Sequence, residues 1–404
     1  MLTYNNKIIY YNSKWINPYR GQYHITYVCN GGTVSGPSYA TPGDVVSFSY
    51  SIGNDWIVDY YALDQTEINS NSFVMPSHDV TVYIYCKLNT DLNVIRFWFY
   101  EDDFNPNNSV PEYGWQGTWT QISASPNLWD YTTTGGHGSW EFALGRLDNV
   151  SDFEIVGANI DHYGGAWGFF FGATPHLIKV QYMPLHWKDD TPVVHTGMFK
   201  DCDKLTEAHV RCDSSVLSVG GLFNGCTALT DVTVANTALV IDFSETFQYC
   251  SFVNAPELNT SSVTSMDAMF QGCSNLVSVP LYDTSNVTTM SSTFRDCTSM
   301  EELPLFNTHN VTNFSYFASM PFNIRPVTSM LRHVPLYDTS SAVNVTCMFS
   351  ETIRVESGAL DLYRQMSQQS SPPSTYTHCF TDCGINTTTG SAELAQIPSD
   401  WKEP

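Results

Sequence analysis

The chain has 404 residues and a formal net charge of −23, and only 14% of its residues are charged. Soluble proteins usually carry about 25% charged residues. Much of the solvent-exposed surface must therefore consist of the uncharged polar residues Ser, Thr, Asn and Tyr. The negative balance argues against binding nucleic acid or an anionic membrane. No stretch approaches the ~20 apolar residues that a spanning helix needs. We expect several domains that bind neither nucleic acid nor membrane.

The first segment, residues 1–21, is predicted to be a hairpin or anchor arm. Apolar and aromatic residues lie on both sides of the Asn5-Asn6 pair, a pattern typical of a β-hairpin. The segment lacks the basic start, the long apolar run and the small-residue cleavage site of a signal peptide. We therefore expect the chain to fold in a cytoplasm.

Residues 22–88 are predicted to form a compact β module. Alternating apolar residues and turn signals indicate strands at 23–36, broken by a Gly31-Gly32 turn, and at 43–51, 56–64 and 72–86. The order of NGGTVSG, PGDVVSFS and FVMPSHDVTVY resembles the internalin-type B-repeat. That resemblance implies a β-grasp-like spacer or adhesion module without catalytic residues.

Residues 89–196 are rich in tryptophan. Strand patterns begin at LNVIRFWFYEDD and recur at 117–122 and 153–160, with turn signals between them. The tryptophans are Trp98, Trp115, Trp119, Trp129, Trp140, Trp167 and Trp187. We predict an all-β or α+β domain that caps the apolar face of the repeats that follow.

Carboxylates in this region are the first candidates for chemistry. Glu101-Asp102-Asp103, together with Asp152 and Glu154, could supply the acid and base of a glycosidase or a weak calcium site. The same acidic run is also typical of a strand-to-turn boundary, which is the interpretation we favour. No G-x-S-x-G elbow and no glycine-rich phosphate loop occurs. We predict no catalytic residue, no cofactor and no metal site.

Residues 197–404 contain a repeat. Phenylalanines recur at steps of 24, 24, 23, 24 and 23 residues, and a cysteine follows three residues after each of the first five. A fixed period of this length is the mark of a stacked solenoid. The phenylalanine column is Phe199, Phe223, Phe247, Phe270, Phe294 and Phe317; the cysteine column is Cys202, Cys226, Cys250, Cys273, Cys297 and Cys383.

The cysteine column has three interpretations. A buried row of thiols, each satisfying the turn of its own repeat, is the one we favour. Disulfides are the alternative, although 11 cysteines is an odd number. Zinc is the weakest, because no Cys-x-x-Cys pair exists.

A second phrase, such as PLYDTSNV at 280–287, recurs between the phenylalanines. Its proline and Asx-Thr pair predict a tight bend, and residues 287–290 are expected to form a short strand. Tyr282, Phe306 and Tyr337 occupy one position of this phrase. They could form an exposed stripe that binds sugar rings or a protein; packing inward between the turns is the alternative.

The end of the chain predicts two helices. In SGALDLYRQMSQQSSPP, Ser357 is expected to cap a helix on which Leu360, Tyr363 and Met366 share a face. Pro372-Pro373 would end it. A final helix in SAELAQIPSDW would seal the stack.

The MFxxCxxL and PLYDTSNVTxM phrases resemble BspA-like leucine-rich repeats of the mycoplasma-lipoprotein type. The whole layout resembles structural proteins of gut bacteriophages. The expected fold is mainly β with short helices: a leucine-rich-repeat solenoid preceded by a β-grasp-like module and a Trp-rich β capping domain.

The resemblance implies a non-catalytic virion protein, a fibre or decoration, assembled in the host cytoplasm. Its arm would contact other virion proteins, its solenoid would bind a host surface glycan or protein, and homo-oligomers are expected. Two alternatives remain open. One is a bacterial cell-surface adhesin, which a signal peptide, lipoprotein cysteine or wall-sorting tail would favour. The other is a tailspike-type carbohydrate-active enzyme.

Overall fold

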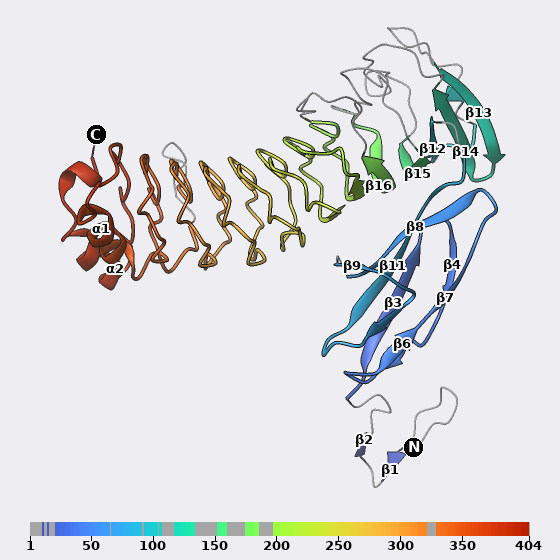
Figure 1. Cartoon of the computed structure of the whole chain (residues 1–404), viewed down its shortest axis with the longest axis horizontal. Helices are drawn as coiled ribbons and strands as arrows, with labels where there is room; N and C mark the ends of the chain where they lie inside the picture. Colours follow the sequence, from blue (N-terminus) through green and yellow to red (C-terminus); the bar gives the residue numbers. More distant parts are fainter. Residues whose placement is uncertain are drawn as a thin grey trace. The chain divides into compact units, whose positions relative to one another are not determined.

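The described residues form a mainly β structure with two short α-helices, as predicted (Figure 1). The computed structural model describes residues 10–11, 14–15, 21–64, 66–90, 93–103, 105–106, 117–133, 152–159, 174–185, 197–320 and 329–403. The chain divides into two compact units, Met1–Asn89 and Thr90–Pro404. Within the described residues, no helix has the length and apolar character needed to cross a membrane.

Little of the predicted arm is described. β1 (Tyr10–Tyr11) and β2 (Lys14–Trp15) pair antiparallel. The hairpin expected around Asn5-Asn6 lies outside the described residues, as do Trp115, Trp140, Trp167 and Trp187 of the tryptophan-rich region.

Unit 1 contains a five-stranded sheet of order β5-β3-β11-β8-β9. Its strands are β3 (Tyr23–Cys29), β5 (Tyr39–Ala40), β8 (Trp56–Leu63), β9 (Thr66–Ile68) and β11 (Val80–Leu88). The central strands β3 and β11 are parallel, and β8 lies antiparallel to β11. In β11, Val80, Val82 and Ile84 are buried, and the residues between them are less buried. This is the period of two expected for a strand.

Two short ladders complete unit 1. β4 (Gly32–Ser35) pairs with β7 (Ser49–Ile52), and β6 (Val45–Ser47) pairs with β10 (Ser72–Val74). The single strand predicted at 43–51 is therefore two strands. The chain changes its pairing partner at Phe48, whose side chain is buried and whose amide donates to the Asn71 carbonyl.

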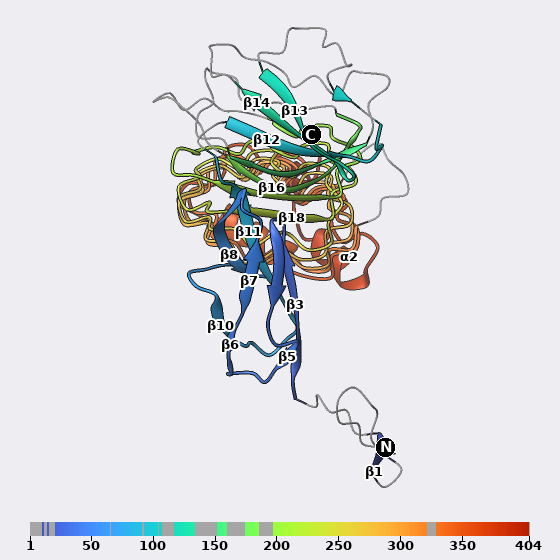
Figure 2. The same cartoon turned by 90° about the vertical axis from the view of Figure 1, so that its right-hand side faces the viewer.

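Unit 2 begins with a seven-stranded sheet of order β13-β14-β12-β15-β16-β17-β18. Its strands are β12 (Asn93–Phe99), β13 (Gly117–Ala124), β14 (Asn127–Thr133), β15 (Phe153–Asn159), β16 (Leu177–Leu185), β17 (Glu207–Cys212) and β18 (Asp231–Ala235). The pairing is antiparallel as far as β15 and parallel from β15 to β18. Figure 2 shows β14, β12, β16 and β18 in this order across the sheet; β15 lies between β12 and β16, and β17 between β16 and β18.

This sheet crosses the domain boundary predicted at 196/197. β17 and β18 belong to the first repeats, yet β16 of the tryptophan-rich region pairs with β17. Phe97, Leu177 and Phe199 accordingly lie in one hydrophobic core. An unpaired edge of the first repeat would expose backbone donors and acceptors, and β16 covers that edge. The tryptophan-rich region and the repeats therefore share one continuous sheet.

After β18 the chain runs as successive coils joined by backbone hydrogen bonds and single parallel bridges (Figure 1). One row of bridges links Ser218, Asp242, Ser265, Thr289, Asn313, Asn344 and Thr375. The short strand predicted at 287–290 is thus a single bridge at Thr289. The backbone turns soon afterwards, because Ser292 takes a left-handed φ of 55°, so no longer strand can form.

The C-terminal helices differ from the prediction in their ends. α1 (Ala359–Ser367) is capped by Gly358 at φ 98°, not by Ser357. A Cβ at position 358 would lie 2.1 Å from the Val334 carbonyl oxygen, so the start of the helix requires glycine. Leu360 and Met366 are buried, as expected.

The final helix predicted in SAELAQIPSDW is two elements. α2 (Thr388–Leu394) is capped by Thr387, whose hydroxyl accepts the Gly390 amide at 3.0 Å. A 3₁₀ turn (Ser399–Trp401) follows Pro398, because proline at that position cannot continue the ladder of helical hydrogen bonds. Trp401 is buried against the ring of Tyr376, with 4.4 Å between the ring centroids.

Candidate functional site: the turn ladder and the leucine ridge

Phenylalanine rings fill the centre of the coils. Along Phe199, Phe223, Phe247, Phe270 and Phe294, successive ring planes differ by 7°, 11°, 9° and 11°, with centroids 5.5, 6.0, 5.7 and 5.7 Å apart. The row changes at Phe317, whose ring lies at 89° to that of Phe294. Phe317 also meets Tyr337 edge-on at 90°. The rings carry packing energy inside the stack and are not available to a ligand.

The predicted role of the cysteines needs correction. The thiols of four column cysteines donate to the phenylalanine carbonyl of the preceding coil, not to the turn of their own coil. The distances are 3.0 Å for Cys226 to Phe199, 3.4 Å for Cys250 to Phe223, 3.0 Å for Cys273 to Phe247 and 3.1 Å for Cys297 to Phe270. Each of these phenylalanine carbonyls already accepts the amide of the cysteine in its own coil; the Phe223 carbonyl, for example, accepts the Cys226 amide. Its second lone pair accepts the next thiol.

The thiols of the column cysteines stay protonated and are therefore unreactive. Burial raises the pKa of the Cys202, Cys273 and Cys383 thiols to about 12 and raises those of Cys226, Cys250 and Cys297 well above their ordinary value. All eleven cysteines are free thiols in this structure. Among the described residues, no group of three or more His, Cys, Asp or Glu side chains is arranged to hold a metal ion.

The aromatic stripe predicted as one possible binding surface is not on the surface. Tyr282, Phe306 and Tyr337 are only 5%, 4% and 0% exposed. The two tyrosine hydroxyls donate to the carbonyls of Pro256 and Pro304, at 2.7 and 2.8 Å. The alternative of inward packing is the one the structure supports.

Leucines occupy the exposed position instead. Leu281, Leu305 and Leu336 immediately precede the buried aromatics, and they are 71%, 65% and 55% exposed. In each phrase the amide of the aromatic residue donates to the proline carbonyl two residues earlier, for instance Tyr282 to Pro280 at 2.9 Å. This tight turn points one of the two neighbouring side chains inward and the other outward. We call Leu281, Leu305 and Leu336 the leucine ridge.

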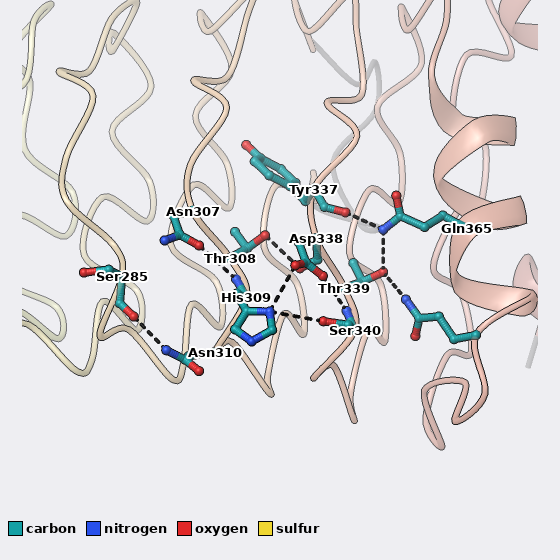
Figure 3. A network of polar contacts seen from close by, with 11 residues as sticks. Ser285, Asn307, Thr308, His309, Asn310, Tyr337, Asp338, Thr339, Ser340 and Gln365 are labelled. Atoms are coloured by element: carbon teal, nitrogen blue, oxygen red, sulfur yellow. Dashed lines mark hydrogen bonds and ion pairs between the residues drawn. The ribbon is translucent and has the colours of Figure 1, made fainter.

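A ladder of threonines joins the coils beside this ridge. Thr260 donates to the carbonyl of Asp283 at 2.9 Å and Thr284 to that of Asn307 at 2.7 Å. Thr308 donates to the carbonyl of Asp338 at 2.8 Å (Figure 3). These threonines are buried. Each bond links one coil to the next, so the turns that carry the ridge are fixed relative to one another. We call this series the turn ladder.

The Asx side chains stiffen the same turns. Asp283 accepts the amide of Ser285 at 3.0 Å, and Asp338 accepts that of Ser340 at 2.9 Å. Hydrogen bonds from these serines lower the pKa of both aspartates, which therefore carry negative charge on the exposed turn surface. The Asx-Thr prediction located these bends, but not the bond from each threonine to the next coil.

Helix α1 ends the turn ladder. Gln365 donates to the Tyr337 carbonyl at 2.6 Å and to the Thr339 hydroxyl at 3.1 Å, and Gln369 donates to the same hydroxyl at 2.8 Å (Figure 3). Thr339 is thus bonded by Gln365 of α1 and by Gln369 just after the helix. The earlier threonines of the turn ladder bond to the next coil instead. At this turn the two glutamines take the place of a partner from the following coil.

A Ser, a His and an Asp also meet on this surface. His309 Nδ1 lies 3.1 Å from Asp338 Oδ2 and 3.4 Å from Ser340 Oγ. A hydrolytic triad places the nucleophile on one ring nitrogen and the carboxylate on the other. Here both contacts involve Nδ1 (Figure 3), so the group has the geometry of a turn-to-turn contact and not of a triad.

The predicted carboxylate pair is divided between separate partners. Asp152 contacts His176 at 3.1 Å and Lys204 at 3.2 Å. Glu154 is buried and accepts hydrogen bonds from Tyr100 and Gln181. Each carboxylate therefore has polar partners of its own. Glu101, Asp102 and Asp103 are exposed after β12.

Sequence reasoning missed a second polar group on this sheet. Glu207 contacts Lys179 at 3.0 Å and His209 at 3.1 Å, and His209 contacts Thr233 at 3.2 Å. His209 and Lys179 hold the pKa of Glu207 down at about 2. The i, i+2 spacing of Glu207 and His209 was the signal available. The group joins β16, β17 and β18.

The repeats match one known family. The family model described as "Mycoplasma protein of unknown function, DUF285" matches residues 194–277, 217–326 and 242–363. These overlapping matches lie between residues 194 and 363, less than half of the 404-residue chain. No curated protein and no solved structure matches the chain. The family match agrees with the resemblance to mycoplasma-type repeats and does not extend to the residues before 194.

Proposed function

We propose that this chain is a non-catalytic adhesion protein, in which a BspA-like leucine-rich-repeat solenoid presents the leucine ridge to a partner. One observation carries the proposal. Three large aliphatic side chains, 71%, 65% and 55% exposed, stand at the same position of successive turn phrases. Single exposed leucines are ordinary, whereas a repeated series on one scaffold is typical of an interaction surface.

The turn ladder supports this role because it makes the ridge rigid. Thr284 and Thr308 connect the turns that follow Leu281 and Leu305 to the next coils. A partner would therefore meet side chains whose backbone is already ordered, and binding would lose less conformational entropy. Burying one leucine fully contributes roughly 1.5–3 kcal/mol. Three such contacts give one copy of the chain a modest binding free energy. Several copies on one particle or cell would bind more tightly through avidity.

The chemistry of the surface favours a protein partner over a sugar. Sugar rings are usually held against aromatic faces, and the candidate aromatics Tyr282, Phe306 and Tyr337 are buried. The exposed carboxylates of Asp283 and Asp338 follow two residues after Leu281 and Leu336. Together with a net charge of −23, they would repel an anionic glycan. We infer a protein partner with apolar and basic side chains.

We further propose that the chain is a bacteriophage virion protein, a fibre or decoration. The arm at 1–21 would contact other virion proteins, residues 22–88 would act as a β-grasp-like spacer, and the chain would form homo-oligomers. The layout of the sequence supports this placement. A bacterial surface adhesin built on the same repeats is the second candidate.

Cosedimentation with intact gut bacteria tests the proposal. We expect the purified protein to sediment with susceptible cells without releasing oligosaccharide. Reproducible oligosaccharide release would instead identify a carbohydrate-active enzyme. An antibody against the protein then separates the two placements: it decorates phage particles in the first and the bacterial surface in the second. Decoration of neither would contradict both.

A further inference from the structure

Two thiols meet in unit 1, far in sequence from the repeat cysteines. Cys29 is the last residue of β3, and Cys86 lies in the neighbouring parallel strand β11. Their sulfur atoms are 3.8 Å apart. The strand register pairs Cys29 with Ile84, so Cys86 lies two residues further along and on the same side of the sheet.

Asn30 fixes this arrangement. Its side-chain oxygen accepts the Cys86 amide at 2.6 Å, and its side-chain nitrogen donates to the Cys86 carbonyl at 2.7 Å. Gly31 then passes close over Cys86. A Cβ on Gly31 would lie 2.9 Å from the Cys86 Cβ and 3.0 Å from the Trp56 ring. The two strands are therefore held together at the point where the thiols meet.

Cys29 differs from all the other cysteines. It is half-buried, whereas the remaining ten are buried. Hydrogen bonds from Cys86 and from the backbone amides of Gly31 and Gly32 lower the pKa of Cys29 to about 7. A thiolate that solvent can reach is the reactive form of cysteine. The repeat cysteines lack both properties.

We propose that Cys29 and Cys86 form a dithiol redox site, which closes to a disulfide when the protein meets a low-molecular-weight disulfide. The Cys29 thiolate attacks one sulfur of the reagent, forms a mixed disulfide and expels the first thiolate. Cys86 then loses its proton to water and attacks the Cys29 sulfur, and the second thiolate leaves. Two protein thiols are oxidised, and one disulfide is reduced to two thiols.

The geometry allows the second step to follow the first. For closure, the sulfurs must approach from 3.8 Å to the ~2 Å of a disulfide bond. Hydrogen bonding with Cys29 is the first cause of the raised pKa of Cys86, and that cause is removed once Cys29 carries the mixed disulfide. Closure would join strands 57 residues apart in sequence and staple unit 1 for use in an oxidising environment.

The test uses the full-length reduced protein, oxidised glutathione and intact-mass spectrometry with peptide mapping. We expect the native protein to lose the mass of two hydrogens through a single Cys29–Cys86 link that dithiothreitol reverses. We expect Cys86→Ser to stop at one glutathione on Cys29, and Cys29→Ser to remain unmodified. Cys86→Ala serves as a second trapping variant if the serine variant does not fold.

Three results would overturn the inference. These are no loss of mass in the native protein, accumulation of glutathione on Cys29 without closure, and a link between repeat cysteines. Mapping on the native protein decides among these even if no variant folds. Disulfide mapping of the native protein does not depend on the adhesion function proposed above, so either proposal can fail without the other.

Discussion

The thiol of Cys273 donates a 3.0 Å hydrogen bond to the carbonyl oxygen of Phe247 in the preceding coil. The same oxygen accepts the amide of Cys250, which belongs to the same coil as Phe247, at 3.1 Å. One carbonyl therefore closes its own turn and binds the next coil. This explains why cysteine recurs at a position where any small apolar residue would fill the space.

Replacing Cys273 by alanine tests this role. Cys273→Ala leaves the Phe247 carbonyl with one partner fewer in a buried site, and we expect the free energy of unfolding to fall by about 1–3 kcal/mol. Cys273→Ser keeps a donor and should recover part of the loss. The exposed neighbour Ser274 provides the control, since Ser274→Ala should change stability by less than ~0.5 kcal/mol. Equal stability of Cys273→Ala and the native protein in urea titrations would contradict the account.

Phe270 tests the stacking of the rings. Its ring lies 5.7 Å from both Phe247 and Phe294, nearly parallel to each, and it also faces Tyr282. Phe270→Ala should lower the free energy of unfolding by about 3–5 kcal/mol, because it opens a cavity in the middle of the stack. Phe270→Leu refills most of that volume and should lose less. Similar losses for both variants in denaturant titrations would show that ring volume does not matter there.

Helix α1 should protect the last coils. The double variant Gln365→Ala/Gln369→Ala removes both side-chain bonds to Thr339 and the bond to the Tyr337 carbonyl. We expect faster amide hydrogen exchange over residues 339–357, with little change near β18. The exposed Gln368 on the same segment offers the matched control Gln368→Ala. Equal exchange rates over residues 339–357 in the native protein, the double variant and Gln368→Ala would mean that the two glutamines do not cap the turn ladder.

Glu207 should make part of the stability depend on pH. Its pKa is lowered from 4.5 to about 2 in the folded protein by His209 and Lys179. A lowered folded-state pKa means that this stabilisation is complete above pH 4.5 and is lost as the pH falls toward 2. Allowing for solvent screening of a partly exposed carboxylate, we expect about 1–2 kcal/mol.

The comparison variant is Glu207→Gln, followed by thermal unfolding at each pH. It should be less stable than the native protein at neutral pH, and the difference should shrink on acidification through that window. Glu302→Gln removes the same formal charge from an exposed side chain and controls for net charge. A difference between native protein and Glu207→Gln that stays constant with pH would rule out this contribution.

Much of the secondary structure followed from the sequence, because it depends on local patterns. The alternation in VTVYIYC predicted β11, and the apolar spacing in ALDLYRQM predicted α1. The first and last residues of the helices and strands were less predictable, because they depend on contacts with backbone that is distant in the sequence. Gly358 begins α1 because the Val334 carbonyl occupies the space beside it, and nothing in the local sequence shows that contact.

The candidate site was predictable in kind but not in detail. The period of the repeat identified the turn phrase, yet Leu281 and Tyr282 are adjacent and both apolar. Only the tight turn formed by the Pro280 carbonyl and the Tyr282 amide decides which side chain faces outward. Likewise, the sheet shared by β16 and β17 joins segments whose sequences show no common period.

The most direct test of the adhesion account is the binding of a ridge variant to cells. Leu281→Asp/Leu305→Asp/Leu336→Asp changes only exposed side chains, so its thermal midpoint should remain close to that of the native protein. We expect its affinity for susceptible cells to fall at least about tenfold, a loss of about 1.4 kcal/mol. The control Leu239→Asp/Val343→Asp alters residues that are 51% and 52% exposed elsewhere on the coils and should bind normally. Native-like binding by the folded ridge variant would contradict the account.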